Sequence, residues 1–90
     1  MNSLLGVSDE EALELAIRHL TDKVNQHRVE MDENPSFVAH TYLAYHQAQL
    51  RILIALDNRL DKYSKLTGNL SILYPDEVAL ARSIVRMAHE

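Results

Sequence analysis

The sequence predicts an all-α protein, a long antiparallel helical hairpin plus a shorter third helix, assembling into a helical bundle. Residues 36–66 contain neither glycine nor proline, and their apolar side chains recur at steps of three and four residues, which is the helical period. Asn34-Pro35, Gly68 and Pro75 interrupt this pattern. Because glycine and proline punctuate helices, the 90 residues are expected to form one domain with helices over about 8–33, 35–67 and 75–89.

The first predicted helix begins at a capping box. Ser8 precedes Glu11 by three residues, so each side chain can accept a hydrogen bond from the backbone of the other. Alternating steps of four and three residues then place six side chains in one seam: Leu13, Ile17, Leu20, Val24, His27 and Met31. Proline disfavours the helical conformation in the residue before it, so this helix is expected to end at Asn34.

The second predicted helix begins at the same pair, with Asn34 as N-cap and Pro35 in the first helical position, or with Ser36 as the cap instead. Its apolar band is too wide for one neighbour, so the helix is expected to lie between two others. Gly68 is expected to cap its end. The apolar segment 70–74 is predicted to lie against the hairpin before the third helix begins at Pro75.

The short connection at Asn34 forces the first two helices to run antiparallel. The facing pairs are predicted to be Leu13 with Leu56, Ile17 with Ile52, Val24 with Tyr45, and His27 with Tyr42. At 1.5 Å per residue, these helices span about 40 and 45 Å and the third only about 22 Å, so the hairpin tip is expected to lack cover. The uncovered side chains are predicted to bind a partner: Met31, Phe37, Val38, Tyr42, Leu43 and Tyr45.

Three occupants of the tip are compatible with the pattern. The segment 70–74 can fold back over it, a second copy can pair with it to form a four-helix core, or a different protein can bind there. Because aromatic side chains dominate interface energetics, we favour self-association into a homodimer or small oligomer.

Two polar residues stand where the pattern calls for apolar ones, His27 in the seam of the first helix and Gln49 on the apolar face of the second. Buried polar groups need hydrogen-bond partners. Such residues either fix the register or the oligomeric state, as in coiled coils, or line a ligand pocket between the first two helices. That pocket would comprise His27, Tyr42, Tyr45, His46 and Gln49.

Composition and charge further narrow the classes of protein to which this chain can belong. A net charge of −4 argues against a general polyanion binder, and the absence of cysteine excludes disulfides and thiolate metal sites. Arg51, Asp57 and Arg59 interrupt the most apolar stretch, so no membrane span is expected. With no signal-peptide pattern at the N-terminus, we expect a cytoplasmic protein that does not associate with membranes.

Histidine and a carboxylate lie one helical turn apart in His27-x-x-Glu30 and His19-x-x-Asp22, a spacing compatible with metal sites. A dinuclear carboxylate bundle, however, needs inward-facing glutamates from several helices, and the second predicted helix has no carboxylate before Asp57. We therefore expect neither a metal nor a cofactor.

The segment Glu10-Glu11-Ala12-Leu13-Glu14 resembles the EExxE half of the magnesium site in all-α nucleotide pyrophosphohydrolases of the MazG and dimeric dUTPase type. The resemblance implies an ExxD motif on a partner helix, where this chain has only Asp57 and Asp61. No nucleophile with a placed base and no glycine-rich phosphate loop occurs either. The sequence therefore predicts a protein that is not an enzyme.

Basic side chains on the second and third helices raise the question of nucleic-acid binding: Arg51, Arg59, Lys62, Lys65, Arg82 and Arg86. A basic strip can bind nucleic acid, but Asp57 and Asp61 interleave with this one, and no helix-turn-helix pattern is present. We expect solvated faces with the intrahelical pairs Glu14–Arg18 and Asp61–Lys65 instead.

The sequence thus favours a non-enzymatic protein–protein interaction module, an adaptor, inhibitor or assembly component that acts as a homo-oligomer. The alternative is a small-ligand-binding or sequestering helical bundle that uses the polar pocket between the first two helices.

Overall fold

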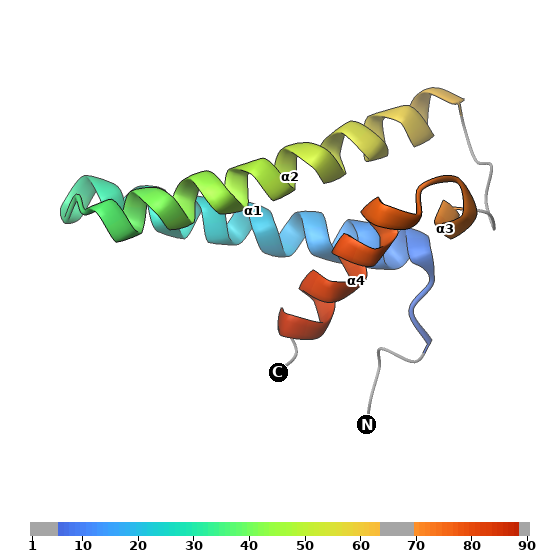
Figure 1. Ribbon diagram of the computed structural model, residues 1–90, viewed down its shortest axis with the longest axis horizontal. Coiled ribbons are helices and arrows are strands. Elements are labelled where there is room, and N and C mark those ends of the chain that lie inside the picture. The colour runs from blue at the N-terminus through green and yellow to red at the C-terminus, as the bar shows by residue number, and fades with distance from the viewer. Residues whose placement is uncertain (1–5, 64–69, 89–90) are drawn as a thin grey trace.

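The computed structural model describes residues 6–63 and 70–88, without side-chain detail for residues 61–63. Its helices are α1 (Asp9–Glu33), α2 (Phe37–Tyr63), the short α3 (Leu70–Leu73) and α4 (Pro75–Ala88). Figure 1 shows α1 and α2 side by side as an antiparallel hairpin, with α4 crossing it obliquely. The predicted all-α hairpin with a shorter additional helix is confirmed.

The ends of the helices follow local capping chemistry. Ser8 Oγ accepts a hydrogen bond from the Glu11 N–H at 3.1 Å, and the Glu11 carboxylate accepts one from the Ser8 N–H at 3.5 Å, so the predicted capping box is present. Asn34 serves as the C-cap of α1, its N–H donating to the Glu30 carbonyl at 2.8 Å. Ser36 caps α2, its Oγ accepting from the Ala39 N–H at 3.0 Å.

The first helix ends at Glu33 as predicted, whereas the second begins two residues later than predicted, at Phe37, with Ser36 as the cap of the two that the sequence allowed. Because Asn34 is used by α1 and Ser36 by α2, α2 begins at Phe37 and Pro35 lies in the turn. The expected continuation of this helix to residue 67 and the Gly68 cap lie outside the described residues, as does residue 89 at the expected end of the third helix.

The segment between α2 and α4 contains a four-residue helix that periodicity did not predict. Leu70 is fully buried and Tyr74 half-buried, as expected of an apolar segment lying on the hairpin, whereas Ile72 and Leu73 are exposed. Tyr74 approaches α2, where the guanidinium carbon of Arg59 lies 5.9 Å from its ring centroid. This segment covers the open end of the hairpin and does not fold over the tip.

The hydrophobic core lies at the open half of the hairpin. α4 packs chiefly against α1, where the small, fully buried Ala12 and Ala16 allow close approach. The main cluster of buried side chains joins α1, α2, Leu70 and α4: Ala12, Leu13, Ala16, Leu20, Leu53, Leu56, Leu70, Val78, Ala81, Ile84 and Val85. The molecule measures 44 × 34 × 17 Å, so it is about two packed helices thick.

Of the predicted facing pairs, His27 with Tyr42 is confirmed, Leu13 and Leu56 are both buried in the core, and the two pairs between them are wrong. Leu13 and Leu56 share the core cluster, and the rings of His27 and Tyr42 stack with their centroids 5.9 Å apart. The other two pairs are wrong, because Ile52 is 48% and Tyr45 59% exposed. The residues next along the helix, Leu53 and His46, occupy the α1-facing positions instead.

None of the helices in the described ranges is long and apolar enough to cross a membrane.

Candidate interaction surface

The apolar side chains of α2 include two seams, which lie on nearly opposite faces of the helix and differ in burial. Residues on the first, here called the inner seam, face α1 and recur at heptad spacing: Ala39, Leu43, His46, Leu50, Leu53 and Leu60. Ala39 and Leu53 are buried, and the other four are half-buried. This seam, together with the buried Leu56 of the core cluster, accounts for the packing of α2 within the chain, so the exposed apolar side chains of α2 need another explanation.

The second seam lies on the solvent side of α2 and is here called the outer seam. Its members recur at alternating steps of three and four residues: Val38, Thr41, Tyr45, Ala48, Ile52 and Ala55. Every one of them is exposed, and the exposed fractions of Val38, Tyr45 and Ile52 are 59%, 59% and 48%. The next position of this seam is Arg59, over the Tyr74 ring. Tyr74 thus lies against the C-terminal end of the outer seam, and the six positions from Val38 to Ala55 remain exposed.

The predicted tip residues divide between these environments. Phe37, Val38, Tyr42 and Tyr45 are exposed, whereas Met31 and Leu43 are half-buried. Leu43 belongs to the inner seam, which explains its partial burial. The exposed aromatic and aliphatic surface therefore extends along the side of α2 from Phe37 to Ile52, further from the tip than the spacing argument placed it.

A cluster of rings holds the exposed tyrosines in place. His27 of α1 stacks on Tyr42, and its ring centroid lies 5.0 Å from that of His46. The rings of His46 and Tyr45 are nearly perpendicular, with their centroids 5.4 Å apart. His46 Nδ1 donates to the Tyr42 carbonyl at 2.8 Å, since a carbonyl oxygen can only accept. The two exposed tyrosines thus already contact other rings of the hairpin in the free chain, and preorganising contacts of this kind lower the entropy lost on association.

The two polar positions singled out in the sequence are both half-buried. His27 Nδ1 lies 3.4 Å from a Glu30 carboxylate oxygen, and this buried nitrogen makes no hydrogen bond within the described part of the chain. Its ring contacts with Tyr42 and His46 position it between α1 and α2. His27 therefore aligns the tip of the hairpin through ring contacts.

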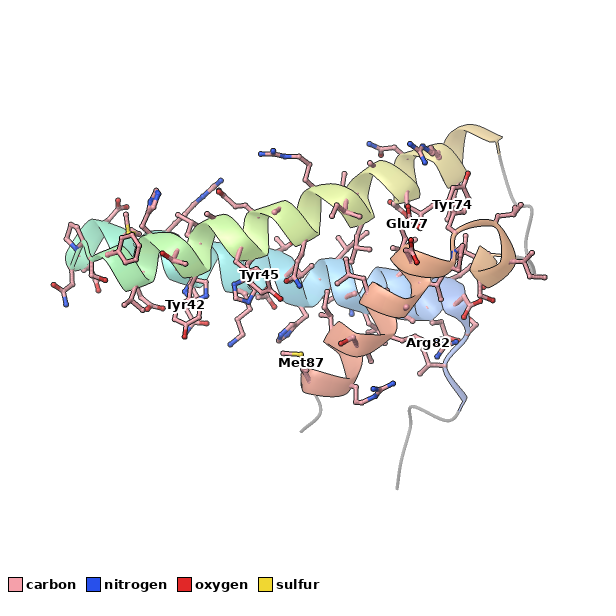
Figure 2. All side chains as sticks on the ribbon, in the orientation of Figure 1. Tyr42, Tyr45, Tyr74, Glu77, Arg82 and Met87 are labelled. Atoms are coloured by element: carbon pink, nitrogen blue, oxygen red, sulfur yellow. The ribbon has the colours of Figure 1, made fainter. Side chains whose placement is uncertain are left out.

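Three of the five predicted pocket residues line a small hollow of about 150 Å³. Tyr45, His46 and Gln49 form its α2 side, and His19 and Leu20 contribute from α1. The remaining lining comes from α4: Leu80, Ser83, Ile84 and Met87. The hollow therefore lies where α4 meets the hairpin, not between α1 and α2 alone as predicted, and His27 and Tyr42 are outside its lining. Figure 2 shows Tyr45 and Met87 on the same side of the hairpin.

The carboxylates that suggested metal or nucleotide chemistry have other contacts. Glu11 belongs to the capping box, and Glu14 accepts a hydrogen bond from Arg18 at 3.1 Å, as the intrahelical pairing predicted. His19 and Asp22 line a second hollow of about 200 Å³ between α1 and α4. Within the described residues, no group of three or more His, Cys, Asp or Glu side chains could hold a metal ion.

The ion pair of Asp9 with Arg82 is a contact that the sequence did not reveal. Arg82 donates to one Asp9 carboxylate oxygen from both Nε and Nη2, at 3.1 and 2.6 Å, and to the Val7 carbonyl at 3.0 Å. The Arg82 guanidinium, followed by the Ser71 hydroxyl, lowers the pKa of Asp9 below its ordinary value of 3.8. Arg82, expected on a solvated face, instead ties α4 to the start of α1, where it points in Figure 2.

Arg82 is consequently engaged within the chain, while Arg51, Arg59 and Arg86 remain exposed on two different helices. The predicted Asp61–Lys65 pair, and the side chains of Lys62 and Lys65, lie outside the described residues.

Comparison of this chain with protein-family models, curated proteins and solved structures finds no match.

Proposed function

We propose that this protein is a non-enzymatic protein–protein interaction module, an adaptor, inhibitor or assembly component, that acts as a homo-oligomer through the outer seam of α2. The observation that supports this most is the run of exposed apolar side chains along the single helix α2. Tyr45 is 59% exposed, and Phe37, at 83%, is the most exposed large apolar side chain in the described part of the chain. Contiguous apolar surface of this kind marks interaction sites.

The chemistry of the surface agrees with that proposal. Tyrosine and phenylalanine are enriched in interface cores, where charged residues are depleted. From Phe37 to Leu50, α2 contains no Asp, Glu, Lys or Arg. Tyr42 and Tyr45 contact the rings of His27 and His46, as preorganised aromatic anchors of protein interfaces contact their surroundings before a partner binds.

The test is the mass of the protein in solution, measured by light scattering over a range of concentrations. The wild type should change from monomer to oligomer as concentration rises. Tyr45→Glu should raise the dissociation constant at least about tenfold, because it places a charge in the centre of the contact. Ile72→Glu is the matched control: Ile72 is 75% exposed on α3, away from the outer seam, and its substitution should leave the mass unchanged.

A wild type that stays monomeric at all concentrations would contradict self-association. An oligomer equally resistant to both substitutions would show that another surface is responsible. Circular dichroism of both variants checks that the helices persist, as expected for changes at exposed positions.

The hollow between α2 and α4 supports a second candidate function, the binding of a small ligand. Its volume of about 150 Å³ is comparable to that of an engineered cavity in another protein that binds benzene. In the neutral ring, His46 donates through Nδ1, so Nε2 is its acceptor, and the Gln49 amide can donate or accept. Met87 adds a polarizable sulfur that suits an aromatic ring.

These groups suit a single ring with an O–H or N–H donor, and phenol is the simplest probe. Phenol should raise the melting temperature of the wild type, since a ligand that binds only the folded state stabilises it. Met87→Gln should reduce that rise, while Ile72→Gln should not. The absence of any rise at millimolar phenol would exclude this candidate.

A further inference from the structure

The outer seam of α2 alternates large and small side chains in a regular order. Val38, Tyr45 and Ile52 repeat every seven residues, and Thr41, Ala48 and Ala55 follow each of them by three. In a heptad these are the two core positions of a helix–helix contact, which pack as knobs into holes. One exposed face of α2 thus carries three large and three small side chains in strict alternation.

We propose that α2 pairs antiparallel with α2 of a second copy through this seam, about a two-fold axis that passes between Tyr45 and Ala48. The inference rests on the proposed function and adds the identity and orientation of the partner. When one of two identical helices is reversed, each large position faces a small one. Val38 then lies against Ala55 of the second copy, Tyr45 against Ala48, and Ile52 against Thr41.

Packing favours the antiparallel over the parallel arrangement. Facing large and small side chains interdigitate and fill each layer evenly, which is how protein interiors reach their normal density. A parallel pair would set Tyr45 against Tyr45 and Ala48 against Ala48. The layer with two tyrosines would then be overpacked and the layer with two alanines would contain a cavity. Overpacking and cavities both destabilise a helix–helix contact.

Charge complementarity points to the same orientation. The end of α1 at the hairpin tip carries three exposed acidic residues, Glu30, Asp32 and Glu33, and Arg59 follows Ala55 at the other end of the outer seam. In the antiparallel register, the tip of one copy reaches Arg59 of the other, and the two-fold axis repeats this contact. A parallel pair would bring the acidic tips together, where like charges repel.

The surface area that a stable dimer must bury indicates how far the contact between the two α2 helices extends. Phe37, Tyr42 and Tyr45 are 83%, 53% and 59% exposed, which amounts to on the order of 400 Å² if each offers about 200 Å². A stable interface buries about 800 Å² per partner. The rest must come from the whole seam between Val38 and Ala55, about 26 Å of helix, so a contact confined to the tip is too small.

Cysteine cross-linking tests the orientation, because the chain contains no cysteine of its own. Val38→Cys and Ala55→Cys are prepared separately, one with a tag that changes its size, and oxidised alone and as a mixture. The antiparallel pair predicts a disulfide-linked heterodimer in the mixture. Each variant alone should give little product, since identical positions would lie about 25 Å apart along the axis, beyond disulfide reach.

The outcomes of cross-linking and light scattering distinguish failure of the antiparallel pairing from failure of self-association itself. Homodimers of Val38→Cys would indicate a parallel pair, and a dimer by light scattering without cross-links would indicate another face. Both results overturn the antiparallel seam but leave self-association standing. A monomer by light scattering would overturn both proposals.

Substitution of a small residue gives a second, independent test. Ala48→Leu should weaken the dimer at least tenfold, because a second large side chain would stand opposite Tyr45. Ala79→Leu is the matched control, since Ala79 is also an exposed alanine within a helix, but on α4, and it should leave the dissociation constant unchanged. Equal effects of the two substitutions would contradict the layer pairing.

Discussion

The two halves of the helical hairpin are stabilised in different ways. At the open half, α4 and Leu70 pack onto α1 and α2, and residues of all four helices form one cluster of buried aliphatic side chains. Among the described residues, that cluster includes no α1 residue beyond Leu20 and no buried α2 residue before Leu53. The tip half consists of two helices held by the buried Val24 and Ala39 and by the rings of His27, Tyr42 and His46.

This difference separates stability from interaction. Aliphatic side chains enclosed on all sides contribute most of the free energy of folding. At the tip half, the apolar side chains that α1 and α4 do not cover remain on the outer seam, where burial can stabilise a complex instead. The comparison therefore predicts that substitutions in the open half mainly change unfolding, and substitutions on the outer seam mainly change assembly.

The largest expected effect on stability concerns two leucines of the inner seam, one in each half. Leu53→Ala removes a side chain that is 0% exposed and should lower the free energy of unfolding by about 3 kcal/mol, because it leaves a cavity. Leu43→Ala at the tip half should lower it by only about 1 kcal/mol, because Leu43 is half-buried and loses less contact area. Urea denaturation measures both, and equal losses would contradict the difference between the halves.

A smaller effect is expected at the link between α4 and α1. Asp9→Asn should lower the free energy of unfolding by about 1 kcal/mol at pH 7, because Arg82 loses a charged, partly exposed partner. Since the pKa of Asp9 is lowered from 3.8 by Arg82, this stabilisation is present above pH 3.8 and is lost as the pH falls through the folded-state pKa. Urea denaturation of both proteins from pH 7 down to pH 3 should show the difference shrinking.

A pH-independent difference would mean that the charge of Asp9 is not what stabilises the contact. Glu10→Gln provides the control, because Glu10 lies beside Asp9 in the first turn of α1 but is exposed. It should lower stability less and leave the contact with Arg82 intact.

The smallest expected effect compares the two helix caps. Ser8→Ala removes a reciprocal capping box and should cost about 1 kcal/mol, whereas Ser36→Ala removes a single hydrogen bond to Ala39 and should cost about 0.5 kcal/mol. Hydrogen exchange should accelerate in the first turn of α2 for Ser36→Ala and in the first turn of α1 for Ser8→Ala. Acceleration across the whole hairpin in the Ser36 variant would mean that the tip supports overall stability more than we infer.

Much of the fold was accessible from the sequence because its determinants are local. The Ser8 capping box and the break at Asn34-Pro35 depend on residues within a few positions of each other. The short third helix could be placed because helix length follows from residue count. The exposure of Phe37 and Tyr45 was also predictable, since a helix about 22 Å long cannot cover the hairpin.

Which residues of α2 face α1 in the middle of the hairpin could not be predicted from the sequence. Ile52 and Leu53 are adjacent and both strongly apolar, so periodicity alone could not decide which of them faces α1. Packing against α1 and α4 selected Leu53 and left Ile52 48% exposed. Because Leu53 and not Ile52 faces α1, the face of α2 that carries Ile52 became the exposed outer seam. The sequence showed this seam only as part of an unusually wide apolar band.

By itself, then, the sequence determined where the three longer helices lie, that α1 and α2 form an antiparallel hairpin, and that α2 has more apolar surface than one neighbour can cover. The tertiary structure decided which seam of α2 is buried, the oblique crossing of α4, and the Asp9–Arg82 contact between residues 73 positions apart. The physical reason is the distance along the sequence over which each interaction acts. Helical periods and caps act between residues a few positions apart, whereas helix rotation and long-range ion pairs depend on side-chain packing among all the helices at once.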